Sequence, residues 1–155
     1  MRRNINILAS DLAPSQLNYY LIRNTNYLHE HHKDINVQVF TENLSRFCMK
    51  PLFGVMNVSE AWGQGGPFIA TNLSTASKLI NYPIASRKLF YIWDLEFLRG
   101  SQRVYDLYAP YYLHPELELV CRSKEHKDLV ENCFNREVKN LVNNFNMNEF
   151  IQILQ

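Results

Sequence analysis

The sequence predicts an α/β protein: a three-layer sandwich in which helices cover both faces of a mainly parallel sheet. Short apolar runs alternate with stretches of helical periodicity along the whole chain. A strand, a helix and a strand follow one another within residues 4–40, and the crossover of such a unit makes its strands parallel. The chain has 155 residues, 46% of them hydrophobic and 20% charged, so we expect a single globular domain over 1–155.

The first βαβ unit is the clearest part of the pattern. Residues 4–9 are apolar and rich in β-branched side chains, which predicts a strand. Ser10 and Asp11 then offer an N-cap, and Pro14 suits the first turn of a helix over about 14–32. Apolar residues alternate with polar ones over 35–40 and predict the second strand.

The rest of the chain continues the alternation. Residues 51–58 form either a strand or the start of a loop. Residues 88–93 are almost continuously apolar, which is typical of a strand buried on both faces. We expect about six strands in one sheet. The further strands are predicted at 68–71, 117–121 and 137–142, and the further helices at 74–81, 102–113, 124–134 and 147–154.

Composition excludes several classes of function. The net charge is +1, with 16 basic and 15 acidic residues, so nucleic acid is not indicated as a partner. No apolar run is long enough for a membrane-spanning helix, and the one after the basic start is too short for a signal peptide. The three cysteines are odd in number and widely spaced, which argues against a disulfide framework and favours the cytoplasm. We interpret the seventeen asparagines as the coding bias of an AT-rich, viral genome.

Five polar groups follow predicted strands, at the sheet edge where parallel sheets bind their ligands: Ser10–Asp11, Thr41–Glu42, Thr71–Asn72, Asp94–Glu96 and Arg122–Ser123. The first strand-to-helix turn lacks glycine, and no Walker A sequence occurs, so we expect neither NAD nor FAD nor any other cofactor. A nucleotide-binding regulator is disfavoured for the same reason. The candidate substrate-binding residues are Ser10, Asp11, Glu60, Trp62, Thr71, Asn72, Arg122 and Ser123, and the candidate catalytic residues are Asp94 and Glu96.

Each candidate has a structural alternative. Asp94 follows the buried strand and is either a general base or a loop carboxylate paired with Arg99 or Arg103. The glycine-rich stretch around Glu60 and Trp62 is either a flexible binding loop or a plain turn. Asn72 or Ser74 can cap the helix over about 74–81, and Ser123 is more simply an N-cap than a ligand contact. The tyrosines at 105, 108, 111 and 112 suit a helix core or interface better than a sugar-stacking platform.

The histidines near the end of the first helix do not predict a metal site. His29 and His32 are three residues apart and share a helix face, but a metal would need a further ligand. The helix dipole favours imidazoles at a helix C-terminus without any metal. We therefore expect no metal.

Four segments resemble the N-terminal Rossmann-like domain of GT-B glycosyltransferases, a family that includes phage and bacterial sugar transferases. Residues 5–10 resemble its opening strand and loop, and residues 88–96 its strand ending in an Asp-x-Glu pair near the acceptor. Residues 119–126 resemble a strand-to-helix step, and residues 138–150 the segment leading to the second domain, with Asn144 where glycine is usual. The loop after the first strand lacks the family's glycines.

The resemblance implies a glycosyltransferase-like protein that supplies the acceptor side of a sugar transfer. The chain ends where the second domain of that family begins, so the nucleotide-sugar donor would be bound by a partner protein or a second copy. In this hypothesis Asp94 is the base, Glu96 supports it, and Ser10, Asp11 and Ser123 line the cleft. The alternative is a non-catalytic binding or structural module derived from such a domain.

Overall fold

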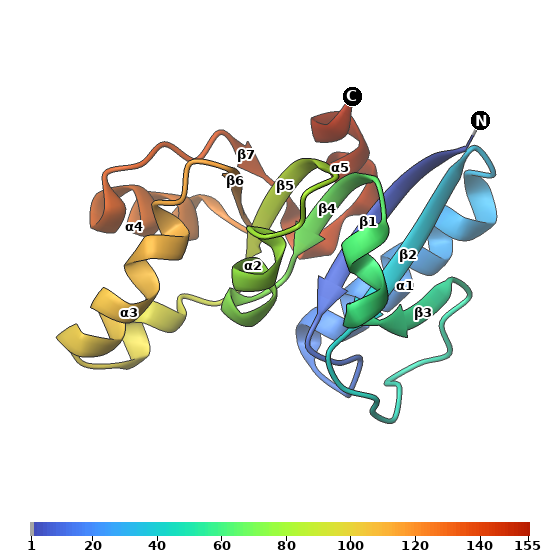
Figure 1. Cartoon of the computed structure of the whole chain (residues 1–155), viewed down its shortest axis with the longest axis horizontal. Coiled ribbons are helices and arrows are strands. Elements are labelled where there is room, and N and C mark those ends of the chain that lie inside the picture. The colour runs from blue at the N-terminus through green and yellow to red at the C-terminus, as the bar shows by residue number, and fades with distance from the viewer. Residues whose placement is uncertain (1) are drawn as a thin grey trace.

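The computed structural model describes residues 2–155, and these residues form one α/β domain around an all-parallel, seven-stranded sheet (Figure 1). The strand order is β3-β2-β1-β4-β5-β6-β7. This confirms the predicted fold class, with one strand more than expected. The strands are β1 (Arg3–Ala9), β2 (Ile35–Thr41), β3 (Gly54–Asn57), β4 (Gly66–Ala70), β5 (Ala85–Ile92), β6 (Leu117–Cys121) and β7 (Asn140–Leu141).

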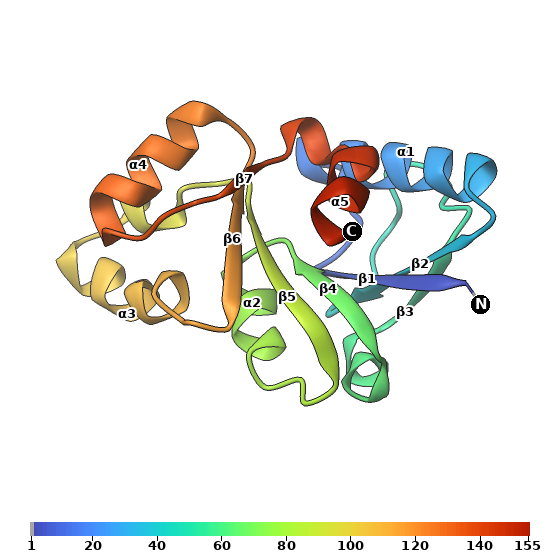
Figure 2. The same cartoon turned by 90° about the horizontal axis from the view of Figure 1, so that it is seen from above.

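Helices cover both faces of the sheet and complete the three layers. Figure 2 shows α1 and α5 on one side and α2 and α3 on the other, while α4 flanks the β6–β7 end. The helices are α1 (Gln16–His31), α2 (Leu73–Leu79), α3 (Gln102–Tyr112), α4 (Lys124–Phe134) and α5 (Met147–Leu154).

The alternation of side chains along each strand builds two cores. Ile7 of β1 faces α1 and α5, whereas its neighbour Leu8 faces α2, and both are fully buried. The last four residues of β5 are likewise buried, which confirms the prediction of a strand enclosed on both faces. Because the central strands are anchored on both sides, the residues that follow them are held rigidly at the edge of the sheet.

Two helix caps agree with the sequence and one does not. Asn72 caps α2 and Ser123 caps α4, each accepting a hydrogen bond from a backbone N–H. The predicted cap of α1 at Ser10 and Asp11 is wrong, because the chain first makes a turn and Ser15 caps the helix instead. The Asp11 carboxylate holds that turn by accepting hydrogen bonds from Ala13 N (3.0 Å) and Asn18 Nδ2 (3.2 Å).

The ambiguous and terminal strands are short. The segment that the sequence left open, 51–58, contains the four-residue edge strand β3, which pairs with β2. The strand expected over 137–142 is reduced to the two residues of β7. The chain then turns through Asn144 and Phe145, which both have positive φ (47° and 53°), before α5 begins.

The strand order reverses direction between β1 and β4. Chain progress runs outward from β1 through β2 to β3 on one side, and from β4 to β7 on the other. In open α/β sheets ligands bind outside the carboxyl ends of the strands at this topological switch point. The carboxyl edge of the sheet is therefore the expected position of a ligand-binding site.

Candidate functional site

The switch point itself is occupied by a closed network of side chains. Ser10, which follows β1, donates a hydrogen bond to Glu42 Oε2 (3.0 Å) after β2. Asn72, after β4, donates to the same serine hydroxyl (2.7 Å). Glu42 also accepts hydrogen bonds from Ser74 (2.7 Å) and from the Lys78 ammonium, its ion-pair partner. We call these five residues the switch-point network.

The network is stabilised by its own charges. Burial alone raises the pKa of Glu42, but the hydrogen bonds from Lys78, Ser74 and Ser10 and the charge of Lys78 bring it below its ordinary value. The carboxylate is therefore ionised and satisfied without a ligand. Thr71 is also used internally, since its hydroxyl donates to Leu8 O (2.8 Å) between β4 and β1.

The end of β5 is built differently. Asp94 and Glu96 follow this strand directly, and together with Thr71 and Asn72 they line a small hollow of about 90 Å³. Burial raises the pKa of Glu96, and the neighbouring charge of Asp94 adds to the increase. The Leu73 backbone hydrogen bond and the charge of Arg99 act in the opposite direction. Glu96 is therefore a half-buried carboxylate with a raised proton affinity.

Asp94 is exposed and forms an ion pair with Arg99 (3.2 Å). This is the pairing that the sequence offered as the alternative to a catalytic role, and it contributes about 1 kcal/mol or less at an exposed position. Both partners are largely in contact with solvent: 46% of the Asp94 side chain and 69% of the Arg99 side chain are exposed.

A second hollow of about 440 Å³ adjoins the first at Trp93. Its lining includes Arg122, whose guanidinium lies 4.6 Å from the centre of the Trp93 ring in a cation–π contact. Ser123 and His126 stand at the start of α4, with Oγ and Nδ1 2.9 Å apart. Burial and the nearby Arg122 lower the pKa of His126, so the imidazole is neutral at pH 7.

The sequence-predicted substrate-binding residues thus fall into four pairs, three of which lie at the carboxyl edge. Thr71 and Asn72 lie beside the two carboxylates, and Arg122 and Ser123 lie in the adjoining hollow. Ser10 and Asp11 lie at the same edge but are held in internal hydrogen bonds.

Glu60 and Trp62 lie elsewhere. They belong to a 3₁₀ helix over Val58–Gly63, where Glu60 caps the turn and Trp62 packs edge-on against Tyr82 (5.6 Å between ring centres). Tyr82 precedes β5, so this packing draws Trp62 toward the amino edge of the sheet. The glycine-rich stretch ends at Gly66, whose φ of 99° suits glycine at the turn into β4.

The aromatic residues of α3 confirm the interpretation as core. Tyr112 is fully buried and stacks on Phe134 (4.4 Å), and Tyr105 stacks on the other side of the same ring system (5.3 Å). The Tyr105 hydroxyl donates to Cys133 O (2.7 Å). Tyr105 and Tyr112 thus pack α3 against α4, and Tyr108 and Tyr111 are partly buried against the same core.

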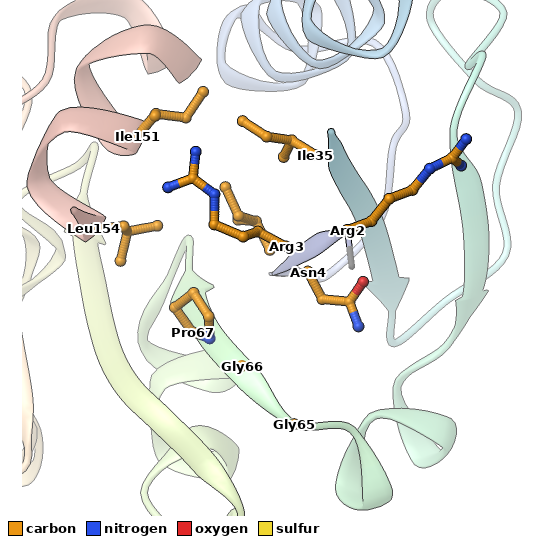
Figure 3. Close-up of a pocket in the computed structure, with 10 residues that line it drawn as sticks. Arg2, Arg3, Asn4, Ile35, Gly65, Gly66, Pro67, Ile151 and Leu154 are labelled. Atoms are coloured by element: carbon orange, nitrogen blue, oxygen red, sulfur yellow. The ribbon is translucent and has the colours of Figure 1, made fainter. Parts of the chain in front are cut away.

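A further hollow, of about 550 Å³, lies at the opposite edge of the sheet (Figure 3). It is lined mainly by apolar side chains such as Ile35, Pro67, Ile151 and Leu154, with Arg3 across it. Arg3 is paired with Asp34 (3.7 Å). Size alone does not make this a site, because no group with acid–base chemistry lines it.

The residues that the structure describes contain neither a cluster of metal-binding side chains nor a membrane-spanning helix. Between residues 2 and 155 no three His, Cys, Asp or Glu side chains come close enough to hold a metal ion. His31 instead stacks on Tyr27 (4.1 Å) and bonds Tyr27 O (2.8 Å). None of the helices in this part of the chain has the length and apolarity needed to cross a bilayer. Burial raises the pKa of Cys121 to about 12, so its thiol is inert.

Several residues at the carboxyl edge were not among the candidate site residues. Glu42, directly after β2, was expected at this edge from strand direction but was not chosen as a candidate. Trp93 was interpreted only as part of a strand, yet it joins the two hollows. Asn143 and Asn144 line the second hollow; the sequence marked Asn144 only as a position where the resembled family has glycine, and it did not mark Asn143.

Comparisons with protein-family models, with curated proteins and with solved structures found no match to this chain.

Proposed function

We propose that this chain supplies the acceptor side of a glycosyl transfer, with a carboxylate of the Asp94–Glu96 pair as the general base. The observation that carries the proposal is the half-buried Glu96 with a raised pKa, at the carboxyl end of the central strand β5 and beside an open hollow. A base works best when its pKa approaches the operating pH and its position is fixed.

The chemistry follows from these groups. A hydroxyl of the acceptor enters the hollow, and the carboxylate removes its proton as the oxygen attacks the anomeric carbon of the donor sugar. A new carbon–oxygen bond forms, and the bond to the donor's diphosphate breaks. The nucleoside diphosphate leaves with the electron pair, so atoms and charges balance without a redox cofactor.

Glu96 is better supported as the base than Asp94, to which the sequence gave this role. Asp94 is exposed and its charge is shared with Arg99, whereas Glu96 is partly withdrawn from water. In this arrangement Asp94 raises the proton affinity of Glu96 and forms an ion pair with Arg99. Variants of each residue separate the two assignments.

The resemblance to GT-B N-terminal domains adds support from an independent feature. The position where that family has glycine is Asn144, and its φ of 47° lies in the left-handed region that favours glycine. The same resemblance assigns the nucleotide-sugar donor to a second domain. We therefore propose that a partner protein or a second copy of the chain completes the cleft, in the cytoplasm of the cell or of the phage host.

The test is a transfer and hydrolysis assay with UDP-glucose, UDP-galactose, UDP-N-acetylglucosamine and GDP-mannose. Release of nucleoside diphosphate is measured for the chain alone and with the product of the neighbouring gene. We expect release in at least one combination, and a loss of about 10²–10⁴-fold in turnover for Glu96→Gln. Asp94→Asn serves as the matched variant, with a smaller loss.

Other outcomes are equally informative. A large loss in Asp94→Asn with activity retained in Glu96→Gln would move the base to Asp94. Absence of nucleotide release in every combination, with both variants folded, would favour the non-catalytic binding module. Sedimentation of the chain as a strict monomer, with no partner recovered, would count against a completed cleft.

A further inference from the structure

We infer that the acceptor is an oligosaccharide rather than a single sugar, bound along a groove that extends from Glu96 past Trp93 to the outer side of α1. This inference rests on the proposed function, because it names the substrate class of the same site. Its basis is the size of the hollows, the residues that they share and the chemistry of their lining.

The hollow at the two carboxylates is too small to hold a whole sugar. The hollow beside Asp94 and Glu96 is about 90 Å³, whereas small-molecule sites generally occupy about 300–1,000 Å³. It admits a hydroxyl and the carbon that bears it, but not a whole sugar with its substituents. The remainder of any acceptor must therefore lie outside this hollow.

Neighbouring hollows at the carboxyl edge share lining residues. Trp93 lines both the small hollow and the 440 Å³ hollow in front of α4. Asn143 and Asn144 line that hollow and also a third one, of about 370 Å³, on the outer side of α1. The three hollows thus form one row, which we call the carboxyl-edge groove. Each of the two outer hollows falls in the size range of a small-ligand site.

The lining of the hollow beside α1 combines amide and aromatic side chains. In the outer hollow polar groups alternate with aromatic rings: its residues include Tyr20, Arg23, Tyr27, Asn143, Asn144 and Asn148. The hydrogen bonds of Asn143, Asn144 and Asn148 to the rest of residues 2–155 run through their backbone atoms, which leaves their side-chain amides free. An amide both donates and accepts, as does each hydroxyl of a sugar.

The charge of the groove favours a neutral chain. The two arginines of the lining, Arg23 and Arg122, are outnumbered by four carboxylates, those of Asp94, Glu96, Glu125 and Glu149, so the groove disfavours an anionic ligand. A nucleic acid would require an excess of basic groups along its path. A neutral oligosaccharide meets both the mixed charge and the free amides.

The floor of the groove is firmly held. Asn24 Nδ2 donates to Asn144 O (2.8 Å) and Phe145 O (3.1 Å), which ties the turn to α1. The Tyr91 hydroxyl donates to Val142 O (2.7 Å) and accepts from Phe145 N (3.3 Å), which ties it to β5. These bonds keep Asn143 and Asn144 exposed at the surface between two hollows.

The experiment is a binding titration followed by ¹H–¹⁵N NMR. The probes are maltohexaose, cellohexaose, mannohexaose and xylohexaose, each beside its own monosaccharide. We expect at least one hexasaccharide to shift the signals of Arg23, Asn143 and Asn144, with an affinity at least tenfold above that of its monosaccharide. Asn144→Gly removes one amide and should weaken that hexasaccharide severalfold. Asn132→Ala, at an exposed position of α4 outside the groove, is the control.

The outcomes separate this inference from the proposed function. If no hexasaccharide shifts these signals, or if monosaccharides bind equally well, the inference is overturned even where transfer to a small acceptor is detected. If hexasaccharides bind along the groove but no donor is ever consumed, the oligosaccharide site stands and the proposed transfer fails. A short peptide or a single-stranded oligonucleotide that shifts the same signals more strongly would also overturn it.

Discussion

Two regions at the carboxyl edge of the sheet carry similar residues, but these residues are used differently. At the switch point, Glu42 is enclosed by Ser10, Ser74 and Lys78, so every polar group has a partner. At the end of β5, Glu96 lies beside a hollow and has a raised pKa. The position after a parallel strand brings polar residues to the edge, but their neighbours decide whether they stabilise the fold or remain available for chemistry.

The pKa shifts express this difference. The pKa of Glu42 is lowered because its hydrogen bonds favour the charged form more than burial disfavours it. The pKa of Glu96 is raised because burial is the larger effect there. A lowered pKa in an acid stabilises the folded state at neutral pH, and a raised pKa destabilises it. The switch-point network therefore contributes stability, and Glu96 reduces it.

The largest effect on stability is expected for Glu42→Ala. The variant leaves Lys78, Ser10 and Ser74 without their shared acceptor, so we expect the free energy of unfolding to fall by about 2–3 kcal/mol. Urea unfolding measures the change. Ser74→Ala, which removes only one of the hydrogen bonds, should cost about 1 kcal/mol. Equal stability of wild type and Glu42→Ala would show that the network is not structural.

Glu96→Gln is expected to act in the other direction. Removing a partly buried charge should raise the free energy of unfolding at pH 7 by up to about 1 kcal/mol, while any transfer activity is lost. Thermal unfolding of the variant beside the parent measures the sign. A destabilised Glu96→Gln would place Glu96 with Glu42 as a structural carboxylate.

The pH dependence of stability should separate the two carboxylates. Stability from Glu42 is present above the ordinary glutamate pKa and is lost as the pH falls through the lowered folded value. For Glu96 stability is highest below the ordinary pKa and falls as the pH rises through the raised folded value. Subtracting Glu42→Gln and Glu96→Gln unfolding curves from that of the parent between pH 3 and 8 should give slopes of opposite sign.

The smallest effect concerns the turn after β7. Asn144 has a left-handed backbone conformation, so Asn144→Gly should relieve strain and stabilise the protein by about 0.5 kcal/mol. Asn143→Gly is the matched control at a position without positive φ, and it should destabilise the protein by a similar amount. If both variants lose stability, the Asn144 side chain makes a contribution to the fold that outweighs the strain.

Much of the fold followed from periodicity. The central strands and the five helices begin and end within a few residues of the predicted positions, because apolar spacing and caps such as Asn72 and Ser123 are local signals. The start of α1 was wrong because Asp11 resembles a cap but holds a turn four residues earlier than Ser15. Aspartate and serine can each cap a helix or hold a turn, and only the path of the chain distinguishes the two roles.

The site was less predictable than the fold. Strand direction correctly brought Thr71 and Asn72 beside Asp94 and Glu96, since the carboxyl ends of parallel strands share one edge. Strand direction could not show that Ser10 donates a hydrogen bond to Glu42, because that depends on side-chain geometry. It gave no position for Trp62, because a glycine-rich stretch does not reveal which edge of the sheet it turns around.

The asparagines were interpreted as coding bias alone, and the structure corrects this. Asn18, Asn24, Asn26 and Asn57 make specific hydrogen bonds through their side chains, most of them to backbone groups in loops. An amide that both donates and accepts suits such positions. A biased genome can supply the residue, but these contacts give it a structural role.

The bond between Phe145 N and the buried Tyr91 hydroxyl has a consequence for the entropy of binding. Surface turns usually open easily, and their amide hydrogens exchange with water quickly. Here the turn is anchored to the central strand, so the Phe145 amide should exchange slowly although it lies in a loop. A groove whose floor is already ordered loses little conformational freedom when a ligand binds, and such preorganisation lets weak, repeated polar contacts add up to useful affinity.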